Sequence, residues 1–147
     1  MKFNVTIDTN VVLDKLQKRE PWSDAADKIF LLVANKKINA SINCSSVTDI
    51  YYIYGREKGK AIARQAITYL SKLLDFITVD KNDCNKALSS EVDDFEDALL
   101  SVCAKKVNAK YIITRDIKDF AKSKVEAITP EEFCESFVKS INGEKLD

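Results

Sequence analysis

Hydrophobic and polar positions follow two alternating periods along the chain. Short apolar or alternating runs predict strands at residues 2–7, 38–44, 76–79, 111–114 and 125–128. Apolar residues that recur every three or four positions predict helices at residues 9–18, 22–34, 45–54, 60–74, 80–88, 94–107 and from 129 onwards. Strands that alternate with helices are typical of an α/β sandwich built around a mostly parallel sheet. We therefore expect that fold class.

Glycine, proline and threonine mark the expected ends of several helices. Gly55 and Gly59 indicate a turn between two helices. Thr129 and Pro130 indicate the start of a terminal helix, because threonine caps helix N-termini and proline is tolerated at the first helical position. The chain has no internal repeat and no linker, so we expect a single domain over residues 1–147. Its polar end, residues 142–147, is expected to be frayed.

Composition excludes several classes of function. No apolar run is long enough to span a membrane and the N-terminus lacks a secretory signal, so a cytoplasmic protein is expected. The 23 basic and 23 acidic residues cancel, which disfavours nucleic-acid binding by overall charge but leaves a local basic patch open. The absence of histidine excludes imidazole catalysis. A metal held by carboxylates alone would be a hard cation such as Mg²⁺ or Mn²⁺.

Acidic residues gather where the predicted strands end. Ligands of open α/β sheets bind at the carboxyl ends of the strands. Six aspartates fall just after a predicted strand or at the head of a neighbouring helix: Asp8, Asp49, Asp94, Asp97, Asp116 and Asp119. These elements can converge on one edge of the sheet, where carboxylates would repel one another. A divalent cation would relieve that repulsion, so the pattern indicates a metal site.

Each of these acids also has a purely structural interpretation. Asp8 could cap the first helix, and Asp94 could cap the helix at 94–107. Asp49 could be the acid of a capping box begun by Ser46. Glu96 and Asp97 could simply complement the helix dipole. No single acid decides between the structural and the functional interpretation.

The helix at 94–107 gives a further indication about Asp97. Its expected core face consists of Phe95, Ala98, Leu99, Val102 and Cys103. Asp97 lies nearly opposite this face, together with Ser101 and Ala104. Small residues allow another element to approach closely, so this side is expected to face a crevice rather than open solvent.

Four segments, in this order and at these spacings, resemble the PIN-domain nucleases, which include the VapC-type toxins of bacterial toxin–antitoxin pairs. The segments are DTNVVLD at 8–14, SSVTDIYY at 45–52, DFEDALLSVCA at 94–104 and TRDIKDF at 114–120. The resemblance implies a three-layer α/β/α fold and an acidic pocket that holds Mg²⁺ or Mn²⁺. It also implies hydrolysis of RNA, a homodimer and, for a toxin, an antitoxin partner.

The resemblance assigns roles to the aspartates. Asp8 and Asp97 match the metal-binding acids of the family, and Asp116 falls where its members carry Asp or Asn. Asp49 falls where the toxins usually carry Glu, so it keeps the charge with a shorter reach. Catalysis is therefore expected to depend on Asp8, Asp49, Asp97 and Asp116, and metal binding on Asp8, Asp97, Asp116 and Asp94. A metal held by Asp8 and Asp97 would lower the pKa of bound water and stabilise charge on the phosphate.

Other residues are expected to support the site or bind substrate. Asn10 matches a position that orients the first aspartate, Thr114 matches a small hydroxyl residue, and Asp119 is a supporting acid. RNA binding needs cations near the acids. The candidates are Arg115, Arg56 and Lys15. For each of these three, a solvated surface position is an equally good interpretation.

Two other functions are compatible with the sequence. A non-catalytic RNA- or protein-binding scaffold could retain the fold, but unpaired acids at all four motif positions would destabilise such a protein without a metal. A phosphatase with Asp8 as nucleophile is disfavoured because Asn10 stands where a second acid would be expected. A metal-dependent endoribonuclease remains the main hypothesis.

Overall fold

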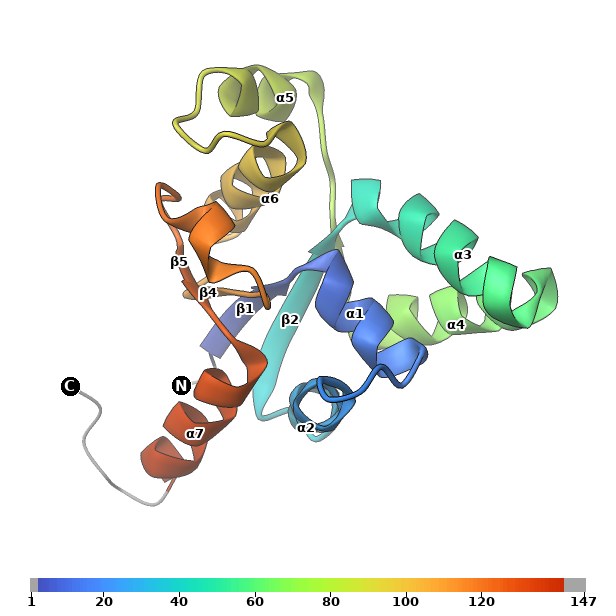
Figure 1. Ribbon diagram of the computed structural model, residues 1–147. Helices are drawn as coiled ribbons and strands as arrows, with labels where there is room; N and C mark the ends of the chain where they lie inside the picture. Colours follow the sequence, from blue (N-terminus) through green and yellow to red (C-terminus); the bar gives the residue numbers. More distant parts are fainter. Residues whose placement is uncertain (1–2, 142–147) are drawn as a thin grey trace.

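A single parallel sheet forms the centre of the molecule (Figure 1). The computed structural model describes residues 3–141, so the predicted frayed tail at 142–147 lies outside the described residues. The strands are β1 (Phe3–Ile7), β2 (Ile38–Asn43), β3 (Asp75–Ile77), β4 (Tyr111–Ile113) and β5 (Glu126–Ile128). They lie in the order β3-β2-β1-β4-β5, and every described pairing is parallel. β1 is therefore the central strand.

Helices cover both faces of this sheet (Figure 1). The helices are α1 (Thr9–Leu16), α2 (Ser23–Ala34), α3 (Cys44–Lys58), α4 (Lys60–Leu73), α5 (Lys81–Leu88), α6 (Phe95–Lys106), the short 3₁₀ helix η1 (Ile117–Phe120) and α7 (Pro130–Ile141). α5 and α6 lie on one face, whereas α1, α2 and α7 lie on the other. The predicted α/β fold class and the three-layer arrangement implied by the resemblance are confirmed. None of the helices described within 3–141 combines the length and hydrophobicity needed to cross a bilayer.

The two faces of β1 contact different layers because side chains alternate along a strand. Val5 and Ile7 are fully buried in the larger core, which includes residues of α1, α2 and α7. Thr6 points to the opposite face, where its hydroxyl lies 3.0 Å from that of Ser41 on β2. Each fully buried Val or Ile contributes about 1.5–3 kcal/mol to stability. The central strand is thus anchored on both sides, and its carboxyl end is held in a fixed position.

The turn expected between Gly55 and Gly59 is shorter than the sequence indicates. α3 begins at Cys44 and continues through Gly55 to Lys58. A Cβ atom at Gly55 would lie 3.5 Å from the Cβ of Ala63, an ordinary van der Waals distance, so Gly55 lies in the contact between α3 and α4 rather than in a turn. Gly59 alone makes the turn, with a φ angle of 91° that favours glycine. α3 and α4 form an antiparallel pair, the α3–α4 arm, beside β2 and β3 (Figure 1).

α6 faces the expected crevice, but not every residue predicted for its core face is buried. Ser101 and Ala104 are buried, and the Ser101 hydroxyl lies 2.6 Å from that of Ser123. The segment around η1 therefore covers this side of the helix, and Asp97 is half-buried. Phe95, predicted to face the core, is 45% exposed. It is the first residue of the helix.

Candidate active site

A cavity of about 380 Å³ lies at the carboxyl ends of the central strands. Its walls come from the start of α1, the start of α3, the start of α6 and the loop after β4. Five carboxylic acids line it: Asp8, Asp49, Glu96, Asp97 and Asp116. We call it the acidic cavity. All four aspartates predicted to be catalytic meet there, although 108 positions separate the first from the last.

Asp8 has both of the roles that the sequence left open. As the N-cap of α1, its Oδ1 accepts a hydrogen bond of 2.8 Å from the backbone N–H of Thr9. Its Oδ2 accepts a second one, also 2.8 Å, from the hydroxyl of Thr114. Burial raises the pKa of Asp8, the two hydrogen bonds oppose that rise, and the charge of Asp116 adds to it. Asp8 therefore caps α1 and lines the acidic cavity at the same time.

The Thr114 hydroxyl connects two of the acids. It donates to Asp8 and accepts a hydrogen bond of 3.0 Å from the backbone N–H of Asp116. Thr114 is fully buried, so the hydroxyl at the centre of this link is shielded from solvent. The resemblance implied that Asn10 orients Asp8, but the Asn10 amide donates instead to Oδ2 of Asp116, at 3.0 Å. Thr114 orients Asp8, and Asn10 orients Asp116.

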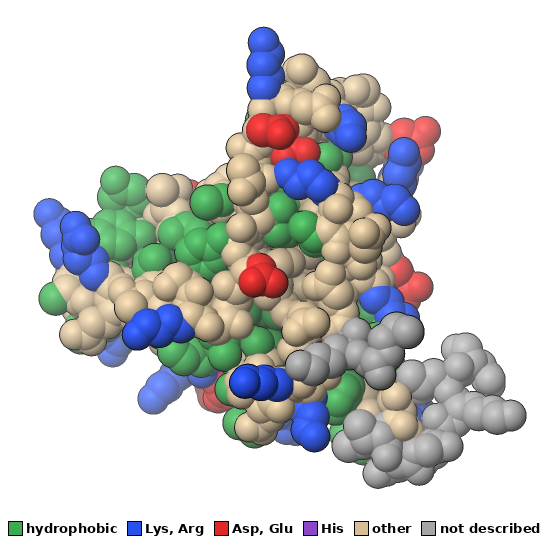
Figure 2. Space-filling view, turned by 180° about the vertical axis from the view of Figure 1, so that it is seen from behind, with side chains coloured by type: hydrophobic (Ala, Val, Ile, Leu, Met, Phe, Trp, Pro, Cys, Tyr) green, Lys and Arg blue, Asp and Glu red, His purple; other side chains and the backbone are tan. Residues whose placement is uncertain are grey.

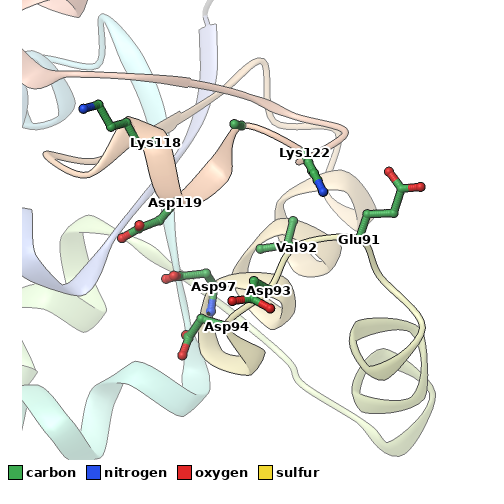
Figure 3. A pocket seen from close by; sticks show the side chains of 9 residues that line it. Glu91, Val92, Asp93, Asp94, Asp97, Lys118, Asp119 and Lys122 are labelled. Carbon is green, nitrogen blue, oxygen red and sulfur yellow. Dashed lines mark hydrogen bonds between the residues drawn. The ribbon is translucent and has the colours of Figure 1, made fainter.

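Asp97 stands where the acidic cavity meets a smaller cavity of about 260 Å³. Asp94 and Asp119 line the smaller cavity, and Figure 3 shows their carboxylates and that of Asp97 pointing to the same side. Asp94 also caps α6, because its Oδ2 accepts a hydrogen bond of 3.1 Å from the backbone N–H of Asp97. Burial, followed by the charges of Asp94, Asp8 and Asp119, raises the pKa of Asp97 to about 7.

Glu96 is a residue of the cavity that the sequence interpretation missed. It was attributed to the helix dipole, but its side chain meets that of Asp49 across the cavity. Burial raises the pKa of Glu96, and the charge of Asp49 and the hydrogen bond to it raise the pKa further. Asp49 does not belong to a capping box with Ser46, because α3 begins two residues earlier, after its N-cap Asn43. Its carboxylate is therefore free to pair with Glu96.

The cations predicted to bind substrate lie elsewhere. Arg115 binds the buried carboxylate of Asp14, with Nε 2.8 Å from Oδ2, and its guanidinium lies 3.9 Å from the ring of Trp22. Lys15 forms an ion pair of 3.2 Å with Asp27 on α2. Neither residue lines the acidic cavity, and exposed Arg56 in the last turn of α3 does not line it either. The geometry does not support a substrate-binding role for these three residues.

Replacing Arg115 with glutamine is expected to destabilise the protein by about 3 kcal/mol, because it leaves the 1%-exposed carboxylate of Asp14 without its closest partner. Urea denaturation measures this effect. Arg56→Gln is the control, and it should change the free energy of unfolding by less than about 0.5 kcal/mol. Unchanged stability together with weaker RNA binding in Arg115→Gln would restore the predicted role in substrate binding.

The cavity's donor atoms fit a hard divalent cation. Its acids supply only oxygen ligands, and the amide oxygens of Asn10 and Asn43, both at its wall, have no hydrogen-bond partner. The raised pKa values of Asp8 and Asp97 reflect burial and uncompensated negative charge, which a cation would offset. Within residues 3–141, no three acidic or thiol side chains already converge as a ready-made ligand set. Side-chain rotation would have to accompany metal binding.

Comparisons with known proteins agree with the geometry. The family model for the PIN domain matches residues 4–118. Ribonuclease VapC1 from Aquifex aeolicus is 31% identical over 138 residues, which cover 89% of this chain and 93% of the relative.

Two solved structures have the same fold. VapBC2 from Rickettsia felis, solved with a DNA fragment from its promoter, has a TM-score of 0.66 at 15% identity and covers 86% of this chain and 98% of its own. VapC20 from Mycobacterium tuberculosis, a toxin that cleaves the sarcin–ricin loop, has a TM-score of 0.65 at 16% identity. The match covers 83% of this chain and 97% of VapC20. The matched residues, the identity to a curated relative and the shared fold lead to one conclusion: the chain belongs to the PIN domain family.

Proposed function

We propose that this protein is a metal-dependent endoribonuclease that hydrolyses RNA phosphodiester bonds at the acidic cavity. The observation that carries the proposal is the meeting of Asp8, Asp49, Asp97 and Asp116 in one cavity. The 31% identity to Ribonuclease VapC1, which spans most of both chains, supports RNA as the substrate. The single domain over residues 1–147 and the cytoplasmic location stay predictions.

Mg²⁺ or Mn²⁺, when bound, would activate water for attack and stabilise negative charge on the phosphate. Asp8, Asp97 and Asp116 are the residues proposed to hold it, with Asp94 and Asp119 adding negative charge from the smaller cavity. Thr114 and Asn10 keep Asp8 and Asp116 in fixed orientations through their hydrogen bonds.

We propose that Glu96, paired with Asp49, donates a proton during the reaction. Its raised pKa means that Glu96 keeps a proton at a higher pH than a free glutamate does. A carboxyl group that is still protonated can donate its proton to the oxygen that leaves when the RNA chain breaks. Glu96 and Asp49 would then supply a proton, whereas Asp8, Asp97 and Asp116 would hold the metal.

We also propose that the protein is the toxin of a toxin–antitoxin pair and forms a homodimer. Structures with the same fold include a toxin–antitoxin complex from Klebsiella pneumoniae, with a TM-score of 0.64 at 19% identity. Hydrophobic side chains gather on the α3–α4 arm (Figure 2), where Tyr52, Ile62 and Tyr69 are more than a third exposed. An apolar surface of this kind fits contact with another protein chain.

The test of the proposed function is RNA cleavage by the purified protein. We expect cleavage with Mn²⁺, no cleavage after chelation with EDTA, and recovery when Mn²⁺ is added back. RNA binding without cleavage under all three conditions would favour the scaffold function instead. Growth arrest on expression, relieved by a co-expressed neighbouring gene product, tests the toxin role separately.

A further inference from the structure

Arg19 is the one cationic residue among the described residues that line the acidic cavity. It lies in the turn between α1 and α2. The other polar residues of the wall are acids, amides and hydroxyl residues. An RNA strand carries a negative charge on every phosphate, so the acids repel it unless cations offset the repulsion. Arg19 is placed where such an offset is needed.

The backbone holds Arg19 at this position. Its N–H donates a hydrogen bond of 3.0 Å to the carbonyl of Asp14, and its own carbonyl accepts one of 2.7 Å from the N–H of Ser23. The preceding residue, Lys18, has a φ angle of 52°, which turns the chain sharply after α1. These features fix the point from which the Arg19 side chain reaches the cavity.

The charge of Arg19 is only partly compensated. Its Nη1 lies 3.7 Å from Oδ1 of Asp14, which is beyond hydrogen-bonding distance. Asp14 is already bound by Arg115 at 2.8 Å, so two guanidinium groups share one carboxylate and a positive charge remains. The Arg19 side chain is 34% exposed. Within the described part of the chain, it donates no side-chain hydrogen bond that would occupy its fork of N–H groups.

We propose that Arg19 binds a backbone phosphate of the RNA strand next to the bond that is cut. This inference rests on the proposed function and adds a substrate-binding residue to it. A planar guanidinium binds two phosphate oxygens at once, which a lysine ammonium cannot do in the same geometry. Asp14 directs the group without neutralising it, and the group lines the same cavity as the metal-holding acids.

Binding of a single-stranded RNA oligonucleotide to the uncleaving Asp97→Asn variant tests the proposal, with fluorescence anisotropy recorded over a range of salt concentrations in Mg²⁺. Adding Arg19→Gln is expected to weaken binding about tenfold. It should also reduce the slope of log affinity against log salt by about 0.7, the value for one lost phosphate contact on a single strand. Adding Arg19→Lys should keep the slope while weakening the affinity, because the charge remains and the fork is lost.

Arg64→Gln is the matched control, because it removes the same charge from an exposed position on α4 outside both cavities. Its affinity should stay within twofold of the Asp97→Asn parent. Equal losses in Arg19→Gln and Arg64→Gln, or an unchanged salt slope in Arg19→Gln, would overturn the proposal. If Arg19→Gln unfolds, Arg19→Lys decides: an RNA affinity equal to that of the Asp97→Asn parent would mean that no forked contact exists. RNA cleavage by the wild type with unaltered binding by the Arg19 variants refutes this inference alone, whereas absence of both cleavage and binding refutes the proposed function.

Discussion

Replacing Asp97 with asparagine is expected to abolish RNA cleavage and, at the same time, to stabilise the metal-free protein. Loss of this carboxylate removes a proposed metal ligand, so the rate should fall by at least about 100-fold, because loss of a residue that only orients a metal ligand already costs about 10–100-fold. The gain in stability follows from its pKa, which burial and neighbouring acids raise to about 7 from an ordinary value of 3.8. A buried acid with a raised pKa resists ionisation in the folded state, and asparagine has no such cost.

The pH dependence of stability makes this expectation specific. Below pH 3.8 Asp97 is protonated in both the folded and the unfolded protein and has no effect. Between pH 3.8 and about 7 the unfolded chain ionises while the folded one does not, so the wild type progressively loses stability. Above pH 7 the loss is complete.

Thermal denaturation in EDTA at pH 4, 6 and 8 measures this difference. The melting temperature of Asp97→Asn should exceed that of the wild type most at pH 8 and least at pH 4. Asp75→Asn, at an exposed position on β3 outside both cavities, should retain both activity and stability. A variant at position 97 that cleaves RNA at the wild-type rate, or that melts at a lower temperature at pH 8, would refute the assignment.

Metal affinity is expected to depend steeply on pH below about 7. Asp97 must lose its proton before it can bind a cation, so the affinity for Mn²⁺ should fall by up to tenfold for each pH unit below its pKa of about 7. Above that pH the affinity should level off. In the acid range each bound cation should release close to one proton.

Isothermal titration calorimetry in two buffers with different ionisation enthalpies measures both the affinity and the proton release. Asp97→Asn should bind Mn²⁺ weakly, and the part of the pH dependence that comes from this residue should disappear. An affinity that is constant from pH 5.5 to 8 would show that Asp97 is not a ligand. Absence of Mn²⁺ binding at every pH would favour the scaffold function.

The sequence predicted that the four aspartates meet in one place, because their positions follow from topology. A parallel sheet brings its strand ends to one edge, so Asp8 and Asp116 had to lie near each other once their strands were recognised. The helix pattern likewise predicted that Asp97 faces a crevice, because Ser101 and Ala104 share its side of α6. These conclusions needed only the period of each element and the order of the strands.

The cations could not be predicted in the same way. Arg115 stands next to Asp116 in the sequence, yet its side chain binds Asp14, which is 101 positions away. Neighbouring residues in a loop point in different directions, and the partner that decides the direction is distant in the sequence. Arg19, which does line the cavity, owes its place to the turn after α1 rather than to any pattern of polarity.

Glu96 and Gly55 were misjudged for a related reason. Each was interpreted from its own helix, Glu96 as a dipole partner and Gly55 as a turn residue. The structure gives each a partner on another helix, Asp49 for Glu96 and Ala63 for Gly55. Contacts between helices depend on how the helices pack, which local propensity does not specify.

The parallel pairing of β1 with β4 determines when, during synthesis, the acidic cavity can be completed. The hydrogen bond between Thr114 and Asp8 joins residues 106 positions apart, so it forms only after a long loop has closed. At ribosomal speeds of about 5–20 residues per second, β4 is synthesised roughly 5–20 s after β1. β2 can already pair with β1 during that interval, but the wall that carries Asp116 is still missing. A nascent chain therefore carries an incomplete acidic cavity until Asp116 has been translated.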